Sequence, residues 1–357
     1  MQRSLTLFEN TNNTESTLKL YKKGLDNYLD FVGYTMRYDE YLELDSEKIH
    51  SHLEDYVMYH RKRNVKGTTI RGYLKPVYLF LDVNRKQYFA KSINRLIPKD
   101  KTKKGNDKPF TDEDIQNMLE STTKKRNKAL VLFFSSVGGR SAVLVDPILC
   151  FKHLHSMPYG CKGVLMYAGS DEEYWGFLTP EASKVLEEYR DERIRKGEDI
   201  TPNSPLFSIE HKKSRFKNEN YLSLPALNSI FDNLEKRANI EKIKTGHRYD
   251  KALLYGFRKR FNTILKIDSD VNSNIAEKLM AHKNGLDGTY LKPTREECFA
   301  EFVKAIPQLT VSKSEKMKLK IESLENEKDM RIAKLESEIK SVYRLLETLD
   351  SKSASIG

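Results

Sequence analysis

The sequence predicts a mainly α protein with a small β-hairpin or sheet, divided into two domains and ending in a long coiled-coil helix. Apolar residues recur at helical spacing along most of the chain, a clear strand pattern occurs once, and residues 313–350 carry a heptad-like repeat. The segment 99–108 holds five lysines and no apolar residue, so it marks a domain boundary. We therefore expect a helical domain at 1–97, a basic linker at 98–109, a second domain at 110–310 and the tail at 311–350.

The N-terminal domain is predicted to contain three amphipathic helices and no strand. The first covers residues 15–32 behind a polar start at Thr14, and the second covers about 46–63. The third follows Lys66-Gly67-Thr68-Thr69, where a threonine is expected to cap a helix that extends through Leu81.

The second domain is expected to be mainly helical around one hairpin. Thr111 precedes three acidic residues and predicts a capped helix start, because carboxylates are favoured in the first turn. The hairpin joins 164–167 to 174–178 through the polar turn 168–172. Thr179-Pro180-Glu181 then predicts another helix start, since threonine caps and proline suits the first helical position.

The tail has the spacing of a coiled-coil seam. Intervals of three and four residues separate its apolar positions, and an extra four-residue step upstream predicts a stutter. Nine basic and nine acidic side chains make residues 313–350 neutral. The clearest part of the seam comprises Ile332, Leu335, Ile339, Val342, Leu346 and Leu349.

Charge and composition restrict the class of protein. The net charge is +11, from 62 Lys and Arg against 51 Asp and Glu, and 19 Tyr and 16 Phe supply apolar groups for packed cores, which excludes wholesale disorder. Because excess positive charge attracts polyanions, nucleic acid is the natural partner, with a merely basic surface as the alternative.

Membrane and disulfide-rich classes do not fit the sequence. The longest apolar run, 129–134, is too short to span a bilayer, and the N-terminus has no signal-peptide pattern. Cys150, Cys161 and Cys298 are too widely spaced for a disulfide framework or a zinc motif. We expect a cytoplasmic, nucleoid-associated protein without a metal.

Four short boxes follow one another in the second domain: Val137-Gly138-Gly139-Arg140, Tyr255-Gly256-Phe257-Arg258, Leu279-Met280-Ala281-His282 and Gly288-Thr289-Tyr290. This ordered set resembles the tyrosine recombinase (phage integrase) family, where an arginine, a His-x-x-Arg box, a Leu-x-Gly-His box and a nucleophilic tyrosine occur in that order. The hairpin and the run from Glu172 to Glu181 resemble archaeal members most closely. The resemblance covers most of residues 10–306 and implies a core-binding domain followed by a catalytic domain.

The resemblance implies that Arg140 and Arg258 are catalytic arginines, His282 is the histidine of the third box and Tyr290 is the nucleophile. Guanidinium groups can grip the non-bridging oxygens of a scissile phosphate where other nucleases use metal ions, so no cofactor is expected. A tyrosine hydroxyl, with an ordinary pKa of about 10, needs nearby cations or a base to attack. The expected product is a 3′-phosphotyrosine link, which a new 5′-hydroxyl can reverse.

Three positions depart from the family pattern. Tyr255 replaces the histidine of the second box, and it can donate a hydrogen bond but cannot act as an imidazolium acid. The hairpin turn holds no lysine to protonate the leaving oxygen, which makes Lys162, just before the first strand, the nearest candidate. A solvated strand end is the alternative interpretation of Lys162. Ala281 replaces the glycine of the third box, a change that we expect to be tolerated.

The motif residues also have structural interpretations. Arg140 could cap the preceding helix, Arg258 could belong to a basic phosphate-binding face, and His282 could be a packed histidine. The joint order of the four boxes favours the catalytic interpretation. The expected DNA contacts are Lys101, Lys103, Lys104, Lys259 and Arg260.

We therefore expect a site-specific recombinase or integrase that acts on double-stranded DNA for integration or excision of a mobile element, as a tetramer assisted by the tail. Removing the residues after Pro307 is expected to weaken self-association and leave covalent attachment to DNA intact. One alternative is a catalytically impaired DNA-binding or architectural protein of the same fold, without a Tyr290 adduct. Another is a type IB topoisomerase-like enzyme that relaxes supercoiled DNA without a defined site. A purely structural coiled-coil protein would leave the boxes and the charge unexplained.

Overall fold

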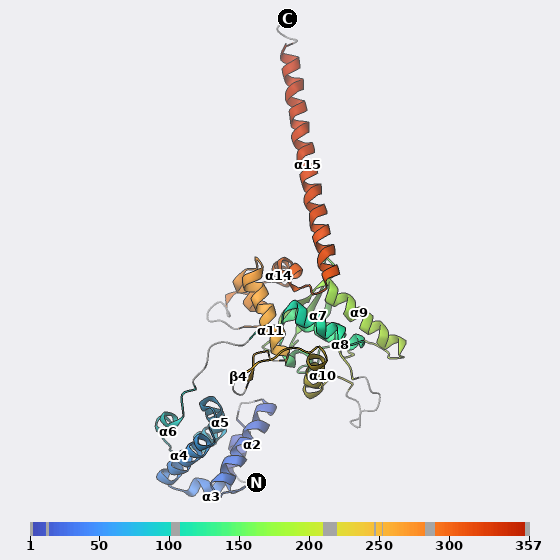
Figure 1. Ribbon diagram of the computed structural model, residues 1–357. Coiled ribbons are helices and arrows are strands. Elements are labelled where there is room, and N and C mark those ends of the chain that lie inside the picture. The colour runs from blue at the N-terminus through green and yellow to red at the C-terminus, as the bar shows by residue number, and fades with distance from the viewer. Residues whose placement is uncertain are drawn as a thin grey trace. The chain divides into compact units, whose positions relative to one another are not determined.

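The computed structural model describes residues 3–11, 14–100, 108–209, 220–245, 248–251, 253–282 and 290–353. The chain divides into two units, residues 1–104 and 105–357, each with its own core (Figure 1). The expectation of a mainly helical protein with a small sheet is confirmed over these residues. Most of the lysine-rich linker, including Lys101, Lys103 and Lys104, lies outside the described residues.

Unit 1 is helical throughout its described part, and two of its longer helices match the predicted spans within one residue. Its helices are α1 (Arg3–Glu9), α2 (Glu15–Phe31), α3 (Tyr38–Glu43), α4 (Ser46–Lys62), α5 (Gly67–Val83) and α6 (Ala90–Leu96). Thr14 caps α2 as expected, because its hydroxyl accepts from the backbone N–H of Thr17. The core is aromatic, and the buried hydroxyls of Tyr28 and Tyr41 satisfy each other at 2.6 Å.

The predicted threonine cap of α5 is wrong. The helix begins at Gly67, and the Asp100 carboxylate accepts from the backbone N–H groups of Gly67 (2.6 Å) and Thr68 (2.9 Å). A carboxylate is a stronger acceptor than a hydroxyl and also interacts favourably with the helix dipole. Since Asp100 lies more than thirty residues further along the chain, local sequence did not reveal this cap.

Unit 2 is built around α8, a helix buried on almost every side. Its helices are α7 (Asp112–Glu120), α8 (Lys125–Val137), α9 (Pro180–Arg195), α10 (Leu224–Arg237), α11 (Leu253–Thr263), α12 (Ser273–Leu279), α14 (Arg295–Leu309) and α15 (Lys313–Ser353), with short turns at η1 (Ser141–Leu144), η2 (Phe151–His153) and η3 (Ile264–Asp268). The helix starts predicted at Thr111 and Thr179 are confirmed, and Thr111 forms a capping box with Asp114.

The predicted hairpin forms the larger part of a three-stranded antiparallel sheet. Strands β2 (Lys162–Met166) and β3 (Tyr174–Leu178) pair with Val164 opposite Gly176. The sequence did not reveal β1 (Leu154–Ser156), which spans three residues and pairs with β2, nor the two-residue pair β4 (Lys244–Thr245) and β5 (Arg248–Tyr249). Strands this short carry too few residues for a period-2 pattern.

The expected truncation after Pro307 would cut into the core of unit 2. Leu309, Thr310 and Val311 are all buried, and Val311 belongs to the main hydrophobic cluster. A deletion meant to remove only the tail must therefore begin further along α15. Among the described helices, none has the length and apolar character needed to cross a membrane.

Candidate active site

Two helix ends present the arginine and histidine that the motifs singled out. Gly138, whose φ is +56°, caps the C-terminal end of α8, and Arg140 follows two residues later. Beyond α12, Ala281 has a φ of +51°, and His282 follows directly. A Cβ on Gly138 would lie 2.5 Å from the Phe261 ring, so both space and backbone conformation require glycine there. Ala281 adopts the left-handed conformation at a cost of roughly 1 kcal/mol, because its Cβ crowds the following carbonyl.

Arg258 connects these two helix ends from the middle of α11. Its side chain is buried, with 6% of the residue exposed, and its guanidinium donates to the Gly138 carbonyl at 2.9 Å and the Met280 carbonyl at 2.6 Å. These carbonyls lie at the C-terminal ends of α8 and α12, where the helix dipoles favour a cation. The buried charge is therefore stabilised by carbonyls and helix dipoles.

His282 completes this arrangement with Glu277. Its Nε2 lies 2.9 Å from Nη2 of Arg258, and its Nδ1 lies 2.6 Å from the Glu277 carboxylate. Arginine can only donate, so Nε2 accepts and the ring proton lies on Nδ1, which donates to Glu277. Burial, followed by the charges of Arg258, Arg140 and Lys266, lowers the pKa of His282 from its usual 6.5. The ring is therefore neutral at pH 7.

The guanidinium of Arg258 keeps capacity for an anion. Of its five N–H donors, three point to Gly138, Met280 and His282, and the other two have no acceptor among the residues that the structure describes. Arg140 adds a second cation close enough to lower the pKa of both Arg258 and His282. Two guanidinium groups at one place suit a doubly coordinated phosphate.

The hairpin turn approaches this site with a carboxylate. Glu172, which follows the turn's Gly169-Ser170-Asp171, lies 3.8 Å from Arg140, and both side chains are about half exposed. Tyr167 and Tyr174, at the two ends of the turn, also border the arginines; burial raises the pKa of both hydroxyls, and Arg140 and Arg258 oppose that rise. Both tyrosines therefore remain protonated hydrogen-bond donors near neutral pH.

Tyr255 lies near the arginines, whereas no described contact joins Tyr290 to them. Tyr255 lies on α11 one turn before Arg258, is 57% exposed, and has the Lys259 ammonium 5.0 Å from its ring centre. Tyr290 is 79% exposed, and in the part of the chain that the structure describes it has no hydrogen bond or ring contact. Residues 283–289, between His282 and Tyr290, are not described.

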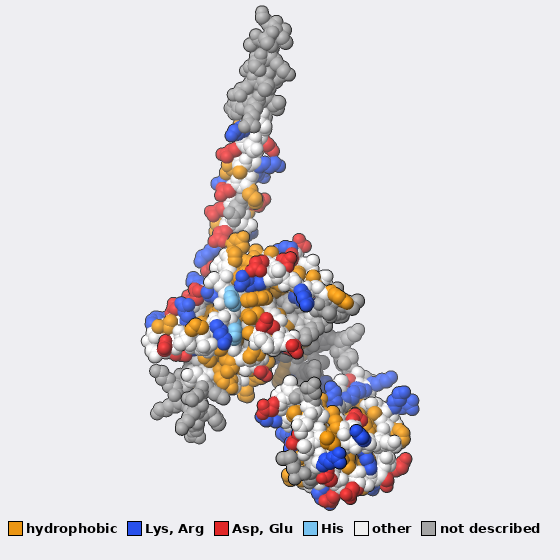
Figure 2. Space-filling model, turned by 180° about the vertical axis from the view of Figure 1, so that it is seen from behind, with side chains coloured by type: hydrophobic (Ala, Val, Ile, Leu, Met, Phe, Trp, Pro, Cys, Tyr) orange, Lys and Arg blue, Asp and Glu red, His pale blue; other side chains and the backbone are white. Residues whose placement is uncertain are grey.

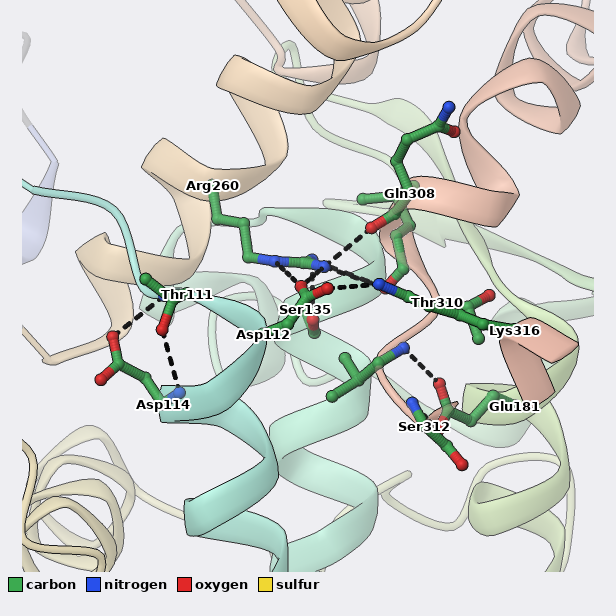
Figure 3. Close-up of polar contacts among 12 residues, drawn as sticks. Thr111, Asp112, Asp114, Ser135, Glu181, Arg260, Gln308, Thr310, Ser312 and Lys316 are labelled. Atoms are coloured by element: carbon green, nitrogen blue, oxygen red, sulfur yellow. Dashed lines mark hydrogen bonds and ion pairs between the residues drawn. The ribbon is translucent and has the colours of Figure 1, made fainter. Parts of the chain in front are cut away.

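Lys162 and Arg260 do not have the surroundings expected of them. Lys162 pairs with Glu187 of α9 at 2.8 Å, at the opposite end of β2 from the turn that carries Glu172. Arg260 is 4% exposed and binds Asp112, Ser135 and the Gln308 carbonyl (Figure 3). The interpretation of Arg260 as a DNA contact stays a prediction, and the enclosure of its guanidinium by the unit favours a structural role instead.

Unit 1 carries a basic groove that sequence reasoning missed. Five exposed cationic side chains line a hollow of about 660 Å³ on its surface, and among the described residues none of them forms an ion pair with a carboxylate. They come from α4, α5 and α6 and from the segment after α6, so they are spread through the sequence. The five are Arg61, Arg71, Lys91, Arg95 and Lys99.

Sequence reasoning also missed both carboxylates of the candidate active site. Glu277 stands five residues before His282, and Glu172 stands 32 residues after Arg140. Neither spacing is a recognised motif. The acidic run at 171–173 in the predicted turn was the one available signal for Glu172. Over the described residues, no cluster of three His, Cys, Asp or Glu side chains could hold a metal ion.

No protein-family model and no curated protein sequence matches this chain. Solved structures do match it. The integrase of transposon Tn1549, in complex with circular intermediate DNA, is 13% identical, with 84% of this chain and 98% of that chain covered and a TM-score of 0.51. A λ integrase dimer bound to a COC′ core site is 12% identical over 82% of this chain and 97% of that chain, with a TM-score of 0.48. XerA recombinase is 18% identical over 84% and 96%, with a TM-score of 0.39.

The match to the Tn1549 integrase bears on the fold, because it spans both units and nearly the whole of the other protein. At 13% identity it does not transfer catalytic residues or a substrate. These comparisons do not establish the archaeal likeness of the hairpin. What the comparison establishes is that this chain shares its fold with tyrosine site-specific recombinases and integrases.

Proposed function

We propose that this protein is a site-specific DNA recombinase or integrase that cleaves and rejoins strands through a 3′-phosphotyrosine. The observation that carries the proposal is the convergence of Arg258, Arg140 and His282 at two helix ends. Over the described part of the chain, two guanidinium donors of Arg258 have no protein acceptor and suit an anion. In this proposal residues 1–97 are the core-binding domain, 98–109 the linker and 110–310 the catalytic domain. The basic groove of unit 1 is the corresponding phosphate-binding surface of the first domain.

The proposed reaction is an in-line displacement at phosphorus. Tyr290 Oη forms a bond to the scissile phosphorus as it gives its proton to His282, and the P–O5′ bond breaks. The 5′-oxygen takes a proton from water and leaves as a hydroxyl. Arg140 and Arg258 hold the two non-bridging oxygens, whose charge grows in the transition state. A 5′-hydroxyl from a second strand then displaces Tyr290, so bond energy is conserved and no external energy source is needed.

His282 is suited to take the phenolic proton. The ring is neutral, its Nδ1–H is fixed by Glu277, and its Nε2 carries a lone pair that accepts from Arg258. In the proposed reaction that Arg258 N–H turns to the phosphate and leaves the lone pair for the phenolic proton. As Nε2 gains the proton, the Glu277 carboxylate stabilises the resulting imidazolium. Tyr167 and Tyr174 are neutral donors beside the arginines, and Tyr255 offers a hydroxyl there. None of the three replaces the missing lysine as a strong acid for the leaving oxygen.

A covalent-adduct assay tests the proposal. Wild type is incubated in EDTA with a library of genomic fragments from the source organism, and protein attached to DNA is detected after denaturation. We expect an adduct with wild type and none with Tyr290→Phe. Tyr159→Phe, at another highly exposed tyrosine (74%), is the matched control and is expected to retain the adduct. An adduct that persists in Tyr290→Phe would refute the assignment of the nucleophile.

One observation favours the alternative of a non-catalytic DNA-binding protein with the same fold. Glu172 approaches Arg140 from the hairpin, where the family resemblance implies a lysine, and a carboxylate competes with phosphate for the guanidinium. This alternative predicts DNA retention without an adduct for wild type. A Glu172→Lys variant tests this alternative further. If an adduct forms with that variant and not with wild type, the natural protein has a catalytic site whose activity Glu172 prevents.

A further inference from the structure

The first turns of α15 are anchored to unit 2. Asp112, at the start of α7, pairs with Lys316, and the Glu181 carboxylate accepts from the backbone N–H groups of Val311 (2.9 Å) and the next residue (3.0 Å) (Figure 3). Leu319 packs against the second hydrophobic cluster of the unit. The root of the tail is therefore held by polar and apolar contacts.

Beyond this root, the helix lacks a surface to pack on. α15 continues through Ser353 as one helix of 41 residues, and every side chain that is described from Ile321 to Ser341 is exposed. Apolar side chains lie open along this part of the helix (Figure 2), among them Leu335, which is 50% exposed. Long helices with an apolar stripe gain most of their stability by packing that stripe, so the pattern requires a partner.

We propose that this partner is the tail of a second copy, in a parallel two-stranded coiled coil. In the heptad, Ile332 and Ile339 occupy a positions and Leu335 a d position, and β-branched residues at a with leucine at d favour parallel dimers. Arg331 is then at g and Glu336 at the following e, so each arginine faces the glutamate of the other helix. In an antiparallel pair g positions face g positions, and this attraction is lost.

Charge and length agree with self-pairing. Residues 313–350 are neutral, with nine charges of each sign, so two copies do not repel each other. The same spacing continues in the sequence beyond Ile339 to Leu349. Because the root is fixed to unit 2, a parallel pair places two catalytic units at the same end of the coiled coil. The inference is independent of the proposed strand transfer, since it concerns assembly without DNA.

Sedimentation of the full chain without DNA tests the pairing. Wild type is expected at the mass of two copies, falling toward one copy on dilution. Leu335→Glu buries a charge in the seam and is expected to sediment at the mass of one copy at all concentrations. Ser337→Glu adds the same charge on the outer face and should remain paired. Wild type at the mass of one copy up to its solubility limit, or a Leu335→Glu variant that stays paired, would overturn the proposal.

Two further variants test the orientation. Ile339→Cys under mild oxidation is expected to form a disulfide between copies, because an in-register parallel pair puts both 339 positions in one layer. Wild type and Ser337→Cys are the controls and should give no such product. Arg331→Glu is expected to weaken pairing, and Arg331→Glu with Glu336→Arg to restore it. If the protein pairs but Ile339→Cys forms no disulfide between copies and the Arg331→Glu, Glu336→Arg double variant does not recover pairing, the parallel arrangement is refuted.

Discussion

Replacing Arg260 tests whether this residue supports the fold or contacts DNA. The guanidinium donates to Asp112 at 2.6 Å, to the Gln308 carbonyl at 2.8 Å and to Ser135 at 3.2 Å. Removing one partner of a buried ion pair costs about 3–5 kcal/mol. Asp112 is half exposed and still pairs with Lys316 in this variant. We therefore expect Arg260→Met to lower the free energy of unfolding by about 3 kcal/mol, near the lower end of that range.

Urea unfolding followed by fluorescence measures this loss in the correct unit. Trp175 is the only tryptophan in the chain and lies in β3, so its signal reports on unit 2. With a urea dependence of about 3 kcal/mol per molar, the midpoint of Arg260→Met is expected to fall by about 1 M. Arg237→Met, at an exposed position on α10, is the matched control and should change the free energy by less than about 0.5 kcal/mol.

The salt dependence of DNA affinity gives the measurement that could refute a structural role for Arg260. A residue that contacts phosphate contributes about 0.9 to the slope of log affinity against log salt concentration. Arg260→Met is expected to leave this slope unchanged at temperatures where the protein stays folded. A slope reduced by about 0.9, with unfolding free energy within about 0.5 kcal/mol of wild type, would refute the structural role.

Three further predictions concern the helix ends of the candidate active site. Gly138→Ala is expected to destabilise unit 2 by about 2–5 kcal/mol through strain and the clash with Phe261, and an unchanged Trp175 transition would contradict this. Ala281→Gly should stabilise the unit by up to about 0.6 kcal/mol in the same assay, since relief of about 1 kcal/mol of left-handed strain is offset by the roughly 0.4–1 kcal/mol entropy cost of glycine. In the folded protein the pKa of His282 lies below its unfolded value of 6.5. Below about pH 6.5 the unfolded state therefore binds more protons than the folded state, and the free energy of unfolding decreases as the pH falls. Adduct formation should decline over the same acidic range, and His282→Asn should be slower with a flatter pH profile; an unaltered profile would exclude His282 as the base.

The sequence determined those parts of the fold that depend on local pattern. Apolar spacing predicted α2 and α4, and the capping residues Thr111 and Thr179 predicted two helix starts, because these signals act over one or two turns. The hairpin was predictable from two apolar and aromatic runs joined by a polar turn. The short elements α1, α3, α6 and β1 were missed, since each is too short to show a period.

The candidate site was only partly accessible from sequence. Ordered motifs brought attention to Arg140, Arg258 and His282, and the structure places them together. The motifs assigned Arg258 to catalysis, but they gave no sign that Arg260, two residues later, holds the C-terminal end of α14. The side of α11 that each residue occupies and the groups packed against it decide between these roles.

Sequence alone thus determined which residue types and which local elements this protein has, because helix caps, apolar periods and heptads are short-range effects. Only the tertiary structure decided which charges are compensated. Glu277 reaches His282, Glu172 reaches Arg140, and Asp100 caps α5 through contacts between separate elements. Electrostatic energy depends on distance in space and on burial, and neither can be calculated before the elements are packed.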